Sequence, residues 1–245
     1  MAVANKITKG IDVSVHNGDI DFNKVKGAGY DFVILRAGYG REISQKDSSF
    51  ERNYKRAKAA GLMVGAYWYS YAVSPADAAK EAQACLQALA GKCFEMPIYF
   101  DIEETSQTSK GGKYCRQLID NFCQNLELSG YYAGVYTSAS VASSLPGGTD
   151  RRYAMWIAHW GVKSPSYTGF YGMWQHTATA SVSGISGNVD GDIAYIDYEK
   201  VMREQGLNGF QLPKKNTTIK VEPTKSENHV ITIQVDGETL FTKEI

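Results

Sequence analysis

Two acidic residues at the end of an apolar segment are the clearest candidates for chemistry. Asp101 and Glu103 close the segment PIYFDIEE. On a strand, an i, i+2 spacing points both side chains to one face, with Cα atoms roughly 6.6–7 Å apart. Two carboxyls this close raise the pKa of one of them, which keeps a protonated acid available near neutral pH. Glycoside hydrolysis uses such a pair, one carboxyl to protonate the leaving oxygen and one group to handle the oxocarbenium ion. A D-x-E triplet is common on solvated surfaces, so the prediction depends on its position after Tyr99 and Phe100.

Polar and aromatic residues also end the other expected strands. In a (β/α) barrel the reacting residues come from the C-terminal ends of the strands and the loops after them. Carboxylates with aromatic faces suit a sugar, whose rings stack on the aromatics while its hydroxyls meet the carboxylates. Structural alternatives exist for two of these residues, since Asp12 could cap a helix and Arg36 could be an ion-pair partner. The expected substrate contacts are Asp12, Arg36, Tyr67, Tyr69, Tyr136, Trp160, Trp174, Gln175 and Asp190.

Other hydrolytic and nucleotide chemistries lack their motifs. The sequence has no HxxxH or HExxH pattern for a metal hydrolase, no GxSxG for a serine nucleophile, and no phosphate-binding glycine motif. Its four cysteines include no CxxC, and no histidine lies at ligand spacing beside them, so buried free thiols are expected rather than a zinc site. We therefore expect neither a metal nor a cofactor.

The elements that must position these residues alternate along the first half of the chain. Ser74 and Pro75 suit the N-cap and first position of a helix, while Ser48 and Gly61 suit the two ends of another. Strand after helix implies parallel strands, and eight strands suggest an α/β fold, a closed but irregular (β/α) TIM-like barrel. The expected helices are 21–27, 48–60, 75–90 and 114–128. The expected strands are 9–15, 31–38, 62–71, 96–102, 131–136, 152–158, 170–175 and 189–196.

Length and charge narrow the class of protein further. The 245 residues suit one sizeable domain with a small appendage. Because 26 basic residues balance 26 acidic ones, no nucleic acid is expected as a partner. No apolar run approaches the ~18 residues of a membrane span, so no membrane insertion is expected. The first ten residues contain no apolar core of a signal peptide, unless one has been removed.

A shift of composition near residue 205 indicates a second region. We expect a catalytic barrel over 1–207, a linker over 208–215 and a small β appendage over 216–245. Asp236 and Gly237 form a strong hairpin signal. An appendage of roughly 30 residues is too small for a stable independent domain, so it should dock on the barrel, a partner chain or a missing extension. Its expected strands are 217–221, 229–235 and 238–243.

Several segments together resemble glycoside hydrolase family 25, the Chalaropsis-type lysozymes of bacteria, fungi and phage endolysins. They run in family order over nearly all of residues 7–200, and in combination they are highly specific. The segments are GIDVSVHNGDIDFNKVK (10–26), FVILRAGYG (32–40), F-x-x-N-Y-x-x-A-x-x-A-G-L-x-V-G-A-Y (50–67), PIYFDIE (97–103), WIAHW (156–160) and MWQHT…GISGNVDGD (173–192).

This resemblance implies an N-acetylmuramidase that cuts the β-1,4 bond after N-acetylmuramic acid in peptidoglycan. Glu103 matches the family's general acid. Asp101 matches the carboxylate that stabilises the transition state or orients the substrate's N-acetyl group as an internal nucleophile. Asp12 and Asp190 match the other two acidic residues of the groove. The positions that the resemblance places along the groove are Tyr67, Trp174 and Gln175.

Three positions depart from the family pattern. Asp192 stands where Asn is commoner, Trp160 replaces a commoner Tyr, and Trp68 replaces a frequent His. These changes leave the expected reaction class intact but put the glycan preference and the pH optimum in question.

Two other functions stay open from the sequence. A chitinase or endo-N-acetylglucosaminidase also carries a D-x-E after its fourth strand, although its longer DxxDxDxE run is missing here. A catalytically silent glycan-binding module is the other alternative. For the muramidase, the partner would be peptidoglycan glycan strands outside the cytoplasmic membrane. It would reach them as a secreted enzyme with its signal trimmed, or as a phage endolysin released through a holin.

Overall fold

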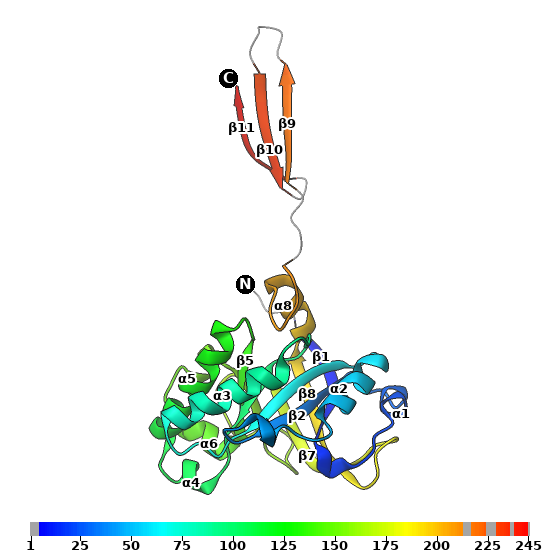
Figure 1. The fold of residues 1–245 in the computed structure, drawn as a ribbon, viewed down its shortest axis with the longest axis vertical. Helices are drawn as coiled ribbons and strands as arrows, with labels where there is room; N and C mark the ends of the chain where they lie inside the picture. The colour runs from blue at the N-terminus through cyan, green and yellow to red at the C-terminus, as the bar shows by residue number, and fades with distance from the viewer. Residues whose placement is uncertain (1–4, 213–216, 224–228, 236–237, 245) are drawn as a thin grey trace. The chain divides into compact units, whose positions relative to one another are not determined.

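Eight strands close into a barrel in sequence order, as the computed structural model shows (Figure 1). Neighbours from β1 to β7 pair in parallel. The structure describes residues 5–212, 217–223, 229–235 and 238–244. The barrel strands are β1 (Asn5–Val13), β2 (Phe32–Tyr39), β3 (Met63–Tyr69), β4 (Ile98–Asp101), β5 (Ala133–Ser138), β6 (Ala154–Ala158), β7 (Met173–Ser181) and β8 (Asn188–Ile196).

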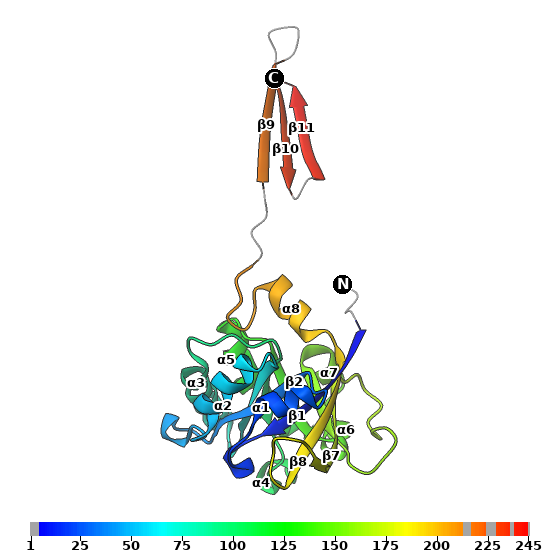
Figure 2. The same cartoon turned by 90° about the vertical axis from the view of Figure 1, so that its right-hand side faces the viewer.

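The last strand departs from the expected parallel arrangement. Strand β8 is antiparallel to both β7 and β1, and the three lie side by side (Figure 2). No helix separates β7 from β8, so the chain turns directly back, which makes the pair antiparallel. The prediction of parallel strands is therefore wrong for β8, while the prediction of a closed, irregular barrel is confirmed.

Helices follow the strands of the first half, as expected. Ser74 caps α3 by accepting a 3.1 Å hydrogen bond from the Asp77 N–H, and Pro75 occupies the first turn. Gly61, with φ of +74°, ends α2 in the left-handed region that favours glycine. Ser48 is not the cap of α2. The helices are η1 (Val15–Asn17), α1 (Phe22–Gly27), η2 (Ile43–Gln45), α2 (Phe50–Ala59), α3 (Pro75–Leu89), α4 (Thr105–Thr108), α5 (Gly112–Leu128), α6 (Ala139–Ser144), α7 (Thr149–Arg152) and α8 (Tyr198–Gln205).

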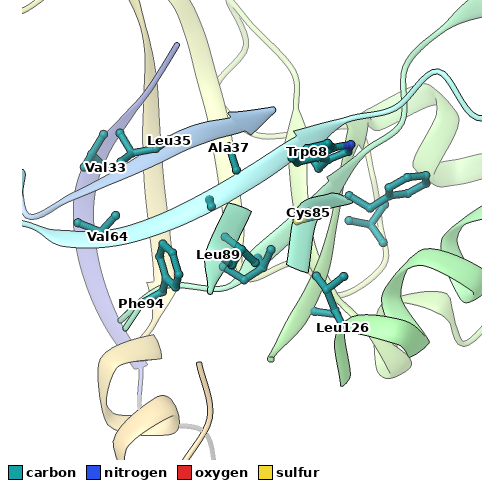
Figure 3. Close-up of a cluster of buried hydrophobic side chains, with 14 of the residues drawn as sticks. Val33, Leu35, Ala37, Val64, Trp68, Cys85, Leu89, Phe94 and Leu126 are labelled. Atoms are coloured by element: carbon teal, nitrogen blue, oxygen red, sulfur yellow. The ribbon is translucent and has the colours of Figure 1, made fainter. Parts of the chain in front are cut away.

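Both faces of the central strands are buried. Along β2, Val33 and Leu35 belong to the apolar layer between barrel and helices (Figure 3), while Phe32 and Ile34 belong to a second cluster with Trp156. The strand alternation thus fills two layers and gives β2 its continuous apolar run. Cys85, Cys115 and Cys123 are buried free thiols, as expected, and Cys93 is a partly buried one.

The short segment directly after α8 belongs to the barrel unit. The chain divides into two compact units, Met1–Gln211 and Leu212–Ile245. Residues 208–211, expected in the linker, belong to the first unit. Asn208 is fully buried, its side-chain amide donating to the Met96 carbonyl at 2.9 Å and accepting from the Tyr132 N–H at 2.7 Å. Two side-chain hydrogen bonds therefore fasten this segment.

The second unit contains a three-stranded antiparallel sheet in the order β11-β10-β9. The expected turn at Asp236-Gly237 lies outside the described residues. In the described part of the chain, no helix combines the length and apolar character needed to cross a membrane. The strands are β9 (Thr217–Pro223), β10 (His229–Val235) and β11 (Glu238–Glu244).

Candidate active site

The acidic pair lies at the C-terminal end of β4. Asp101 is the last residue of the strand and only 4 % exposed, whereas Glu103 is exposed two residues further on. Burial raises the pKa of Asp101 well above its usual range, and Glu103 and Asp12 raise it further, while Arg36 opposes the shift. Among the described residues no group hydrogen-bonds the buried Oδ1 of Asp101. That oxygen is a buried acceptor without a donor from these residues.

Glu103 combines access to solvent with a raised pKa. Desolvation by the surrounding side chains is the main cause, Glu104 and Asp190 add to it, and the Tyr69 hydroxyl opposes it. The Tyr69 hydroxyl donates a 2.7 Å hydrogen bond to Glu104. A carboxyl with a raised pKa at an accessible position can hold a proton and deliver it to a bound molecule.

Three further carboxyls enter the site, one from β1 and two from the antiparallel strand β8. Their register places Asp12 opposite Asp190 and Gly10 opposite Asp192. Burial raises the pKa of Asp12, and Asp190 raises it further. Asp190 is half-buried, and its desolvation raises its pKa as well. We call Asp12, Asp101, Glu103, Asp190 and Asp192 the carboxylate cluster.

Asp192 is the most deeply buried member of the carboxylate cluster. Its side chain is fully buried, and Oδ1 accepts a 2.8 Å hydrogen bond from the Trp156 indole. No N–H or O–H of a described residue reaches Oδ2. The carboxyl lies within hydrogen-bond reach of Asp12, so one of the two must carry a proton. Burial raises the pKa of both carboxyls, but their mutual hydrogen bond raises the pKa of Asp192 and lowers that of Asp12, which favours the proton on Asp192.

Gln175 connects the cluster to the aromatic residues. Its Nε2 donates to Asp12 at 2.7 Å, and its Oε1 accepts from the Tyr136 hydroxyl at 2.8 Å and the Trp160 indole at 2.9 Å. Gln175 is only 2 % exposed, so these hydrogen bonds are shielded from water and fix the orientation of its side chain. Gln175 thus holds Asp12 and two aromatic side chains in one network.

The aromatic candidates divide by exposure. Trp160 is 53 % exposed and offers an open ring for stacking. Tyr136 and Trp174 are mostly buried with satisfied polar ends, the Trp174 indole donating to the His159 carbonyl at 2.8 Å. Tyr67 and Tyr69 are half-buried, and Tyr67 packs edge-on against Trp156. The structure therefore brings all the expected aromatics to this rim, with Trp160 the most accessible.

Arg36 combines the structural and functional roles that the sequence left open. Its Nε donates to Asp47 Oδ2 at 2.7 Å, which is the ion pair of the structural alternative. It also lowers the pKa of Asp101 by charge. Sequence reasoning missed Asp47, although its Oδ1 accepts from the N–H and hydroxyl of Ser49 in a turn before α2. The Asp-Ser-Ser-Phe segment is a recognisable turn signal that could have drawn attention to it.

The described residues contain no group of three or more His, Cys, Asp or Glu side chains placed to hold a metal ion. Asp12 is not the N-cap of either helix that follows β1; its carboxylate accepts a hydrogen bond from Gln175 instead. The geometry therefore defines an acid-rich candidate site at the C-terminal ends of the strands.

The family model "Glycosyl hydrolases family 25" matches residues 11–185, and the chain belongs to this family. It is 32% identical to the autolytic lysozyme of Clostridium acetobutylicum, over 75% of this chain and 55% of that protein. It is also 32% identical to lysozyme M1 of Streptomyces globisporus, over 74% of this chain and 66% of that protein. The chain thus spans between half and two thirds of the length of these two relatives.

Solved structures agree with this assignment. The bacterial lysozyme of Streptomyces coelicolor superposes with a TM-score of 0.65 at 30% identity, over 76% of this chain and 90% of that one. The CTP1L endolysin superposes with a TM-score of 0.66 at 26% identity, over 80% of this chain and 69% of that one. The family resemblance seen in the sequence segments is confirmed, and with it the class of glycoside hydrolases.

Proposed function

We propose that this chain is an N-acetylmuramidase that hydrolyses the β-1,4 bond between N-acetylmuramic acid and N-acetylglucosamine in bacterial peptidoglycan. The observation that carries the proposal is the Asp101–Glu103 pair, one carboxyl buried and one exposed at the end of β4. Membership of family 25 and similarity to proteins named lysozymes support the choice of substrate.

Glu103 is the proposed general acid. Its raised pKa keeps it protonated to a higher pH than an ordinary glutamate, and its exposure lets it reach a glycosidic oxygen. As the bond between the anomeric carbon and that oxygen breaks, the Glu103 proton passes to the leaving oxygen. The resulting carboxylate can then accept a proton from the water that completes hydrolysis.

Asp101 is the proposed partner of the substrate's 2-acetamido group. In its ionised form it would accept the acetamido N–H, which favours attack of the acetamido oxygen on the anomeric carbon. The same charge would stabilise the oxocarbenium-like transition state. Arg36 favours this ionised form, in opposition to burial and to Glu103.

The remaining site residues hold the sugar and the two reacting groups in place. Trp160 offers a stacking face, and Gln175 fixes both Trp160 and Asp12. Asp12 and Asp190 are proposed to accept hydroxyl groups of the glycan, with Tyr67, Tyr69, Tyr136 and Trp174 lining the same rim. Neither a metal nor a cofactor takes part in this scheme.

The substrate determines where the protein would act. We propose peptidoglycan glycan strands outside the cytoplasmic membrane as its partner. Secretion with removal of a signal, or release of a phage endolysin through a holin, would bring it there.

The test of this proposal is Glu103→Gln, which keeps the shape of the side chain but removes its transferable proton. New reducing ends released from purified peptidoglycan should fall by about 10²–10⁴-fold, the usual contribution of a general acid. Glu104→Gln is the matched control, because it alters the neighbouring carboxylate and should lose far less. Full activity of Glu103→Gln with an unchanged melting temperature would refute the assignment.

A further inference from the structure

A hollow of about 450 Å³ opens beside the acidic pair, at the ends of β1, β2 and β3. Its lining includes His16, Arg36, Tyr39, Lys46, Tyr69 and Tyr71, which we call the basic pocket. Arg36 acts on Asp101, and Tyr69 contacts Glu104 and lies next to Asp101 in the β3–β4 register. The basic pocket therefore lies next to the acidic pair.

The charge of the basic pocket is opposite to that of the carboxylate cluster. Arg36 uses Nε for Asp47, while its two terminal nitrogens have no hydrogen-bond acceptor among the residues that the structure describes. Asp47 does not occupy the position beside Arg36 that an anionic ligand would take. Its oxygens are already occupied by Arg36, the Val15 N–H and Ser49, and it is 3 % exposed.

Lys46 adds a second cation to the basic pocket. Its Nζ lies 3.2 Å from Glu51, but Glu51 is shared with Lys92 at 3.0 Å. Two lysines thus face one carboxylate, and this local group keeps a net positive charge. Because the Lys46 side chain is 36 % exposed, it can turn toward a bound anion at little cost.

Aromatic rings form the other wall of the basic pocket. Tyr71 is 52 % exposed and packs against Tyr39 and Tyr69, with ring centroids 6.1 and 5.1 Å apart. The backbone that carries Tyr71 is fixed, since its N–H donates to Glu81 at 2.9 Å and Gln107 donates to the Ser70 hydroxyl at 2.9 Å. The wall is therefore in place before a ligand arrives, and its faces suit aliphatic groups.

We propose that the basic pocket binds the peptide stem of N-acetylmuramic acid through the free carboxylates of that stem. The inference rests on the proposed function, because it names the part of the peptidoglycan that fills a second site. Where stems are attached, the lactyl carboxyls of muramic acid are amide-linked and the glycan strand carries no charge, whereas its peptides end in carboxylates and contain short aliphatic side chains. These match the free guanidinium end, Lys46 and the tyrosine wall. The stem is attached to the sugar whose bond is cut, so it must lie near the acidic pair.

The test compares three soluble substrates: glycan strands with tetrapeptide stems, the same strands with their stem carboxyls amidated, and strands stripped of peptides by an amidase, with the freed lactyl carboxyls then amidated. We expect the unmodified protein to show a KM about tenfold lower for the first substrate than for the other two. Lys46→Gln should raise the KM for the first substrate about three- to tenfold, with kcat unchanged and the other two substrates unaffected. Lys26→Gln, on the exposed part of α1, is the matched charge control and should behave like the unmodified protein.

Equal KM values for all three substrates, or an equal effect of Lys46→Gln on all three, would overturn the peptide-stem site. Activity of Lys46→Gln on the stripped strands shows that the variant is folded. Release of no new reducing ends from any substrate by the unmodified protein would instead refute the proposed function, and the two failures are thereby distinguished.

Discussion

The two halves of the barrel contribute to the site in different ways. From β1 to β5 each strand is followed by a helix, and this half supplies the acidic pair at the end of a single strand. From β6 to β8 no helix intervenes, and the antiparallel return of β8 supplies Asp190 and Asp192 opposite β1. The first half thus provides the proposed reacting groups from local sequence. The closing half provides a hydrogen-bonded support that depends on long-range register.

The largest effect of disturbing this arrangement is expected in the first half. Asp101→Asn keeps the size of the side chain but removes the charge proposed to stabilise the transition state. We expect kcat to fall by about 10²–10³-fold, the usual cost of losing one preorganised electrostatic contact. Single-turnover rates on soluble glycan fragments would measure it. A kcat within threefold of the unmodified protein would mean that Asp101 is not charged during the reaction.

A smaller effect is expected from the closing half. Gln175→Leu removes the hydrogen bonds to Asp12, Tyr136 and Trp160 while keeping the side-chain volume similar. Because these bonds position groups without taking part in bond cleavage, we expect kcat/KM to fall by about tenfold, mainly through KM. The same kinetic assay applies. A loss as large as that of Asp101→Asn would place Gln175 among the reacting groups and erase the contrast between the halves.

The pH dependence of the rate sharpens the role of Arg36, which lies in the first half. Activity needs Glu103 protonated and Asp101 ionised, so the rate should follow a bell-shaped curve. Because both pKa values are raised, both limbs should lie above the ordinary carboxyl values of about 3.9 and 4.3. Arg36→Gln removes the charge that lowers the pKa of Asp101 and should move the acid limb to higher pH.

Arg36→Lys is the matched control for this shift, since it keeps a positive charge at the same place. Rates on peptide-free glycan fragments with amidated lactyl carboxyls avoid any contribution from the basic pocket. An acid limb that stays in place in Arg36→Gln would show that Arg36 does not act on Asp101.

The smallest effect on rate is expected at Asp192. An asparagine there can accept from the Trp156 indole and donate to Asp12, so it reproduces the bonds of a protonated Asp192. We expect the activity of Asp192→Asn to stay within about twofold of the unmodified protein.

Its effect on stability should depend on pH. The folded pKa of Asp192 is raised above the unfolded value of about 3.9. The stabilisation by its protonated form is therefore complete below that value and is lost as the pH rises through the folded pKa. Asparagine does not titrate, so Asp192→Asn should gain stability relative to the unmodified protein as the pH rises. Thermal unfolding at several pH values would show this. Destabilisation at every pH would mean that Asp192 is ionised in the folded protein.

What could be predicted from the sequence follows the same division. The acidic pair is local, since Asp101 ends β4 and Glu103 follows two residues later, so continuing the strand alternation predicts both groups at one rim. The start of α3 is equally local, since Ser74 and Pro75 are adjacent. These features need no knowledge of the rest of the fold, and the structure agrees with them.

The features that sequence reasoning missed depend on residues far apart. Gln175 and Asp12 are 163 positions apart, and their contact requires closure of the barrel. Whether β8 runs parallel or antiparallel decides which of its residues face Asp12, and the alternation of β8 reads the same in both directions. Asn208 lies in a polar, linker-like stretch, yet it is buried because its amide fastens to backbone groups of two other segments. The amino-acid composition of a segment does not predict such long-range contacts.

The most direct test of the central claim, that the acidic pair makes this chain a muramidase, is mass spectrometry of borohydride-reduced products from purified peptidoglycan. The account predicts new muramitol ends with the unmodified protein and none above background with Glu103→Gln. New glucosaminitol ends would move the cut to the other glycosidic bond and favour an endo-N-acetylglucosaminidase. Protein bound to the wall without any new reducing end would contradict catalysis altogether and leave a glycan-binding module.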